Sequence, residues 1–146
     1  MAFHFPLEAV LRYRESIEQR EHLALEQIQQ NIVRVEQRIS QLEEDASAAT
    51  HNRMADLAHG TRAAVVQSAY EYQKALEQQI QTLRALLQDL KIKWRQQLSV
   101  YEHARRNRET LEELRDQQLE TYTREQTKRQ QAVIDDLFLA RRIRNL

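Results

Sequence analysis

Apolar residues recur at steps of three and four positions along two long stretches of the chain, as expected for α-helices that bury one face. In the first stretch, the steps from Ile28 to Leu42 alternate between four and three, which is the spacing of a coiled-coil seam. Two consecutive four-residue steps, from Ala24 to Ile28 and on to Ile32, predict a local break in that heptad pattern. We predict a first helix over about residues 5–48.

A second, longer stripe of apolar residues runs from Ala69 to Ala140 and predicts a helix over about residues 63–142. Trp94 falls in this stripe, which favours a packed side chain over the alternative, an exposed contact for a partner. Tyr70 and Tyr72 point in different directions on a helix, so at least one of them should lie at the surface.

The helical pattern fails between about Glu44 and Thr61, where Ser, Thr, Asn and His gather, and we place the reversal over about residues 49–62. The single glycine of the chain, Gly60, lies here, and the single proline, Pro6, stands at the start of the first helix, where it is tolerated. Apolar residues between 54 and 58 could add a turn of helix, with Gly60 as a C-terminal cap and Thr61 as a weak N-terminal cap. This segment is the predicted reversal of the chain.

With only one such break, the sequence predicts an all-α fold in which two long helices form an antiparallel coiled-coil hairpin, as a single elongated domain over residues 1–146. Because the second helix is the longer, its C-terminal part should protrude beyond the first. We expect this overhang over Glu102–Gln131, where charged residues interleave and the apolar stripe is thin. The chain becomes apolar again after Gln131.

Composition and charge narrow the possible functions. Lys and Arg number 22, as do Asp and Glu, so the formal net charge is zero and a nucleic-acid partner is disfavoured. The absence of cysteine excludes disulfides and thiolate metal sites and fits a cytoplasmic protein. No stretch has the length of a membrane span, and the N-terminus shows no cleaved leader.

The sequence offers no arrangement typical of an enzyme. One glycine cannot build a phosphate-binding loop, and the five histidines include no pair at helical metal-binding spacing. Adjacent acidic residues such as Asp135 and Asp136 point about 100° apart on a helix, so they cannot converge on one substrate atom. We expect no catalytic residue, metal, cofactor or small-molecule substrate.

Three segments resemble the FliJ family of the flagellar type III export apparatus. The opening FHFPLEAVLRYRESIEQREHLALEQI is similar to the start of that family, and AYEYQKALEQQIQTL is similar to the opening of its second helix. The tail RETLEELRDQQLETYTREQTKRQQAVIDDLFLARR is similar to its closing pattern of basic and Gln-rich turns before an acidic pair and a final arginine. The resemblance covers essentially the whole chain.

The resemblance implies a non-enzymatic stalk similar to the central subunit of rotary ATPases. Its implied partners are the hexameric export ATPase, the cytoplasmic domain of the export gate protein FlhA, and export chaperones. The chain itself would be cytoplasmic and would be held at the inner membrane only through these partners. The implied ATPase-ring contacts are Leu7, Leu11, Arg14, Asp135, Asp136, Phe138, Arg141 and Arg142. The implied gate contacts are Leu42, Tyr72 and Leu76, although Asp45 and Ala49 stand where some relatives carry aromatic residues.

Two other functions fit the same pattern. One is the equivalent stalk of a virulence type III secretion system, and the other is a generic coiled-coil scaffold that dimerises through the overhang. A monomer of unusual elongation would favour a stalk, whereas a dimer in solution would favour a scaffold.

Overall fold

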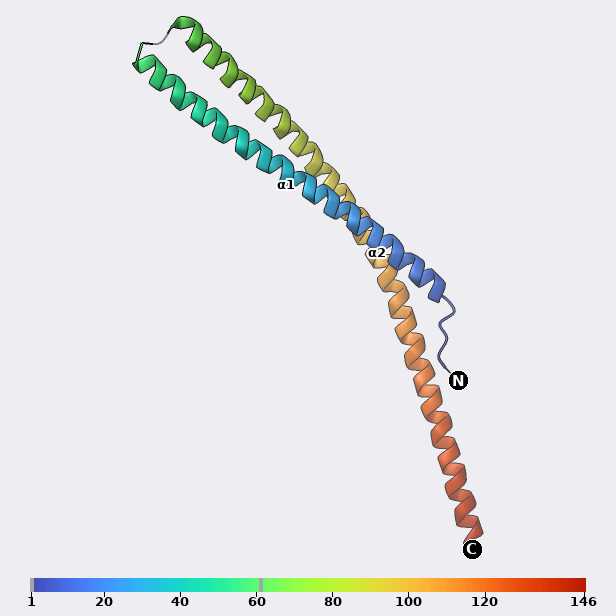
Figure 1. The fold of residues 1–146 in the computed structure, drawn as a ribbon. Coiled ribbons are helices and arrows are strands. Elements are labelled where there is room, and N and C mark those ends of the chain that lie inside the picture. Colours follow the sequence, from blue (N-terminus) through green and yellow to red (C-terminus); the bar gives the residue numbers. More distant parts are fainter. Residues whose placement is uncertain (1, 61) are drawn as a thin grey trace. The chain divides into compact units, whose positions relative to one another are not determined.

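In the computed structural model, which describes residues 2–60 and 62–146, the chain forms two long α-helices, α1 (Glu8–Ala58) and α2 (Ala63–Arg144) (Figure 1). No strand occurs among these described residues. The two helices pack against each other, and the prediction of an all-α helical hairpin is confirmed. Pro6 and Leu7 form a turn ahead of α1, so this helix begins slightly later than the expected residue 5.

The reversal is much shorter than the predicted segment over residues 49–62. Helix α1 continues to Ala58, and Gly60 then adopts a φ of 75°, a left-handed conformation that glycine adopts without strain. At the start of α2, the carbonyl of Arg62 accepts hydrogen bonds from the amides of Val65 and Val66 at 3.1 and 3.3 Å. The helix continues past Thr50 because this half-buried hydroxyl donates to the Ala46 carbonyl at 3.0 Å and accepts a hydrogen bond of 2.7 Å from Gln73 of α2. The cap predicted at Thr61 lies outside the described residues.

The chain divides into two compact units. The first, which we call the hairpin unit, is Glu21–Tyr101, and the second, the terminal unit, comprises Met1–Arg20 and Glu102–Leu146. Each unit contains a segment of both helices, so each has its own cross-helix contacts.

In the hairpin unit the core is an apolar seam. Four buried residues, two from each helix, form one cluster: Ile39, Leu42, Leu76 and Ile80. Leu83 and Leu87 of α2 pack against this cluster together with Val35 of α1. Cross-helix hydrogen bonds fall at decreasing α2 numbers as the α1 number rises, from Glu21 with Gln97 through Glu43 with Arg84 to Thr50 with Gln73. This order establishes that the helices are antiparallel.

The predicted break in the heptad of the first helix stays a prediction, because Ala24 and Leu25 are both half-buried. Partly or fully buried positions continue at alternating steps of four and three through Glu21, Leu25, Ile28 and Ile32. A stripe traced through apolar residues alone misses Glu21, because its polar side chain occupies a seam position and bonds to Gln97. On α2, Trp94 is half-buried at a seam position, so it is a packed residue.

In the terminal unit, residues 2–20 pair with α2 as far as Tyr122. The buried residues among those described here are Phe5, Leu11 and Ala104. The expected overhang beginning at Glu102 is therefore wrong, because an ion pair and an extended N-terminal segment supply contacts that an apolar stripe does not reveal. Every described residue of α2 beyond position 126 is exposed, so the protruding C-terminal helix is confirmed.

Candidate interaction surfaces

The C-terminal end of α2 carries the largest group of exposed apolar side chains in the terminal unit. All of them are more than half exposed: Val133, Ile134, Leu137, Phe138, Leu139 and Ile143. Consecutive residues of an α-helix point about 100° apart, so Leu137 and Leu139 lie on nearly opposite sides of α2. This end is apolar on more than one side, which is typical of a helix that is enclosed by other protein.

Charged residues accompany this apolar end. Arg141, Arg142 and Arg144 lie in the last turn of α2, where cations interact favourably with the negative end of the helix dipole. Arg141 and Arg144 also line an open groove of about 650 Å³ together with Ile134, Leu137, Phe138 and Ala140. Nearly two turns before Arg141, Asp135 accepts a hydrogen bond of 2.9 Å from Gln131. The surface can therefore offer a partner both apolar contacts and guanidinium donors.

The three predicted contact residues near the N-terminus differ in their exposure. Leu7 is exposed, Arg14 is half-buried, and Leu11 is only 1% exposed. A buried side chain acts through packing, so Leu11 can support a surface but cannot itself touch a partner while residues 2–20 are in place.

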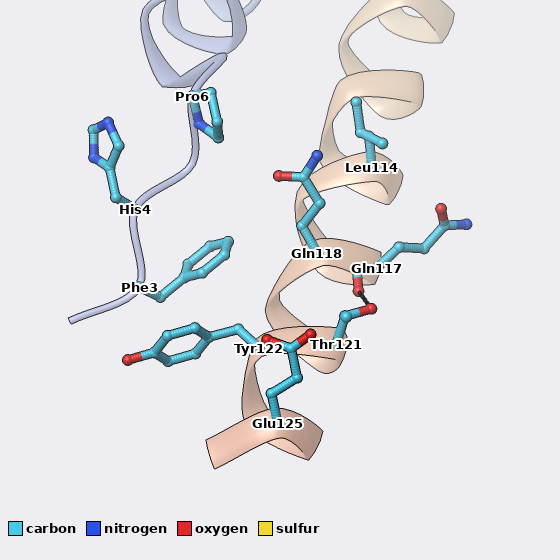
Figure 2. Close-up of a pocket in the computed structure, with 9 residues that line it drawn as sticks. All are labelled: Phe3, His4, Pro6, Leu114, Gln117, Gln118, Thr121, Tyr122 and Glu125. Carbon is cyan, nitrogen blue, oxygen red and sulfur yellow. Dashed lines mark hydrogen bonds between the residues drawn. The ribbon is translucent and has the colours of Figure 1, made fainter. Parts of the chain in front are cut away.

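The extended segment before α1 lies against α2 (Figure 2). Phe3 points toward Tyr122, and their ring centroids are 5.6 Å apart in a tilted arrangement, a favourable aromatic geometry. His4 points away from α2. Between the segment and the helix lies an open groove of about 570 Å³, lined by Phe3, His4, Pro6, Leu114, Gln117, Gln118, Thr121, Tyr122 and Glu125.

The three predicted gate contacts belong to the hairpin unit. Leu42 and Leu76 are buried in the apolar cluster, whereas Tyr72 is 56% exposed. An open groove of about 490 Å³ runs beside Leu42, with Arg38, Ala75, Gln78, Gln79, Thr82 and Leu83 as its other lining residues. Tyr70 is exposed as well and lies 5.9 Å from the guanidinium of Arg53. Both tyrosines are thus at the surface.

An ion pair inside the terminal unit was not expected from the sequence. Arg108 donates from Nε to Oε2 of Glu18 and from Nη2 to Oε1 of Glu18 at 3.3 Å, which is a two-pronged contact across the helices. Its Nη1 donates to Oε2 of Glu112 at 2.6 Å on the same helix. The hydrogen bond with Glu18 raises the pKa of the Arg108 guanidinium, despite partial burial. The sequence pattern could have predicted this pair, because extending the heptads of both helices places Glu18 and Arg108, which have opposite charges, at seam positions.

Two further kinds of site are absent from the described part of the chain. No three His, Asp or Glu residues come together there in a way that could hold a metal ion. Neither α1 nor α2 contains a segment that is both long and apolar enough to cross a bilayer.

Comparison with known protein families gives a match over nearly the whole chain. A family model described as the flagellar FliJ protein matches residues 3–146. The chain belongs to the FliJ family. No curated protein and no solved structure matches it significantly. As a FliJ-family member, the chain is a protein associated with flagellar export, and its family is a non-catalytic component of that apparatus.

Proposed function

We propose that this FliJ-family chain is a non-enzymatic stalk in the cytoplasm, which binds the hexameric export ATPase at the inner membrane and couples it to the export gate protein FlhA and to export chaperones. The observation that supports the ATPase contact is the apolar end of α2. Six apolar side chains that are more than half exposed lie there on several sides of a single helix. Such a surface is covered best by a partner that surrounds it, as the interior of a ring does.

Within this proposal, the predicted ATPase contacts take two roles. Phe138, Arg141 and Arg142 are exposed and would touch the ATPase, as would Asp135 and Asp136 beside them. Leu7 would also contribute from the surface. In contrast, Leu11 would act by holding the N-terminal segment on α2.

The ATPase contact is tested by replacing one exposed aromatic residue with alanine and measuring affinity for the purified export ATPase. Phe138 is 65% exposed, and Tyr13 of α1 is 63% exposed in the same unit, which makes it a matched control. We expect Phe138→Ala to weaken binding by about tenfold or more, because interface energy is concentrated in a few aromatic and arginine residues. Tyr13→Ala should change affinity less than about twofold. Equal weakening by both variants, or by neither, would refute the assigned surface.

Far-UV circular dichroism separates a binding defect from a folding defect. Because the Phe138 side chain is exposed, its removal should leave helicity unchanged. A loss of helicity in Phe138→Ala would mean that the residue supports the fold instead.

The contact with the gate protein has its own test. Tyr72 is the exposed member of the predicted set, so Tyr72→Ala should weaken binding to the FlhA cytoplasmic domain. Tyr70 is the control, since it is similarly exposed and lies two residues away. If Tyr70→Ala weakens binding as much as Tyr72→Ala, the gate contact does not depend on the predicted position.

A further inference from the structure

The terminal unit holds its two helix segments together with few apolar contacts. Among its described residues, only Phe5, Leu11 and Ala104 are buried, and the last has a single methyl group. The next α1 seam positions after Leu11 are Arg14 and Glu18, both charged. Residues 2–20, which we call the N-terminal leg, therefore have a thinner apolar seam than the hairpin unit, although Leu11 is buried and Ile17 is half-buried.

The leg also makes a two-pronged ion pair with α2, between Glu18 and Arg108. The side chains are only 16% and 22% exposed, so water and salt screen this pair less than a surface pair. Two acidic residues on α2 also lie near the guanidinium, with Oε2 of Glu112 at 2.6 Å and Oε1 of Glu109 at 3.9 Å. These two carboxylates remain beside Arg108 whether or not the leg is in place.

This arrangement allows the ion pair to open without leaving an isolated buried charge. If the leg moves away, Arg108 keeps its bond to Glu112, and the Glu18 carboxylate becomes hydrated. The usual obstacle to breaking a buried ion pair, an uncompensated charge left inside, is thus absent on both sides. When the leg returns, Glu112 already holds the guanidinium, which lowers the entropy lost on closing.

We propose that the N-terminal leg is a releasable cover over α2, and that Glu18 and Arg108 form the clasp that keeps it closed. Release exposes the face of α2 between Ala104 and Tyr122 while the apolar seam of the hairpin unit stays intact. Local opening of this kind is expected where apolar contacts are few. It is a property of the chain alone, so it is tested without the ATPase or any other partner.

The test uses thiol labelling, for which the absence of native cysteine is an advantage. A cysteine in place of Ala104 lies one turn before Arg108 on α2, where the native residue is 6% exposed, and we expect it to react with a thiol reagent when the leg opens. A cysteine in place of Ala46, which packs against the apolar cluster, reports on the hairpin unit. In the full chain, Glu18→Gln should speed labelling at position 104 by about tenfold or more, since a charge-assisted bond is lost. Labelling at position 46 should change less than about twofold.

Two further variants complete the experiment. Glu43→Gln removes the partner of Arg84 in an exposed cross-helix ion pair and should leave both labelling rates unchanged. Arg108→Lys keeps the charge but loses the two-pronged geometry, so its labelling rate at position 104 should fall between those of the parent chain and Glu18→Gln. The proposal is overturned if Glu18→Gln leaves position 104 protected, or if it speeds labelling at both positions equally, which would indicate global unfolding. In the chain without introduced cysteines, Glu18→Gln should also speed hydrogen exchange of the amides of residues 8–20. Unchanged exchange there would contradict the labelling result.

Discussion

The two units of this chain share one heptad spacing but fill it with different side chains. In the hairpin unit, isoleucine and leucine occupy the seam and form a contiguous buried cluster. In the terminal unit, Leu11 and Ala104 are buried, but charged Arg14, Glu18 and Arg108 hold other seam positions, and an extended aromatic segment supplements them. Spacing alone therefore makes two helices pair, whereas the chemistry at each seam position decides how firmly they stay together.

The largest expected effect comes from the apolar cluster of the hairpin unit. Leu42 is 2% exposed, and Leu42→Ala should lower the free energy of unfolding by about 3 kcal/mol, through lost burial and the cavity left behind. Urea unfolding followed by circular dichroism measures this value. Leu23→Ala is the control on the same helix, because Leu23 is exposed and its loss should cost less than about 0.5 kcal/mol. Similar costs for the two variants would contradict the burial pattern.

A leucine-to-alanine substitution at a buried position of the terminal unit should destabilise only the residues around it. Leu11 is as buried as Leu42, yet we expect Leu11→Ala to leave the main unfolding transition nearly unchanged, because residues 2–20 open separately. Hydrogen exchange should instead show residues 8–20 losing about 2 kcal/mol of protection. A large shift of the whole transition would mean that the two units unfold together.

The reversal gives an effect of intermediate size. Gly60 adopts a φ of 75°, and an added Cβ would meet no atom within 4 Å, so the cost of Gly60→Ala is confined to the backbone. We expect about 1 kcal/mol of destabilisation, measured by thermal unfolding. Gly60→Asn should cost less, since asparagine tolerates this conformation better than alanine. If alanine and asparagine are equally tolerated, the glycine is not what sets the turn.

The smallest effect is expected at the exposed ion pair between Arg84 and Glu43. Its N–O distance of 2.7 Å is short, but both side chains are at least half exposed. Removing the pair with Glu43→Gln should change the free energy of unfolding by less than about 0.5 kcal/mol. A double-mutant cycle with Arg84→Gln checks this, and a coupling above about 1 kcal/mol would make this pair as important as a partly buried one.

Much of the candidate surface could be predicted from the sequence because it lies on a single helix. The apolar tail from Val133 to Ile143 stands out against the charged segment before it, and the structure leaves it exposed. In contrast, the burial of Leu42 and Leu76 could not be distinguished from exposure by their apolar character. Whether an apolar residue of a helix is buried or exposed depends on where the partner helix packs against it.

By itself, the sequence determined that the chain would form two helices reversing near Gly60, because heptad spacing and the rarity of glycine and proline are local properties of the chain. Only the tertiary structure decided how far the helices pair and through which groups. Glu18 meets Arg108, Glu21 meets Gln97, and Phe3 meets Tyr122 across long sequence separations. Polar side chains pair across a seam only when folding brings them together, so a pattern of apolar residues could not reveal these contacts.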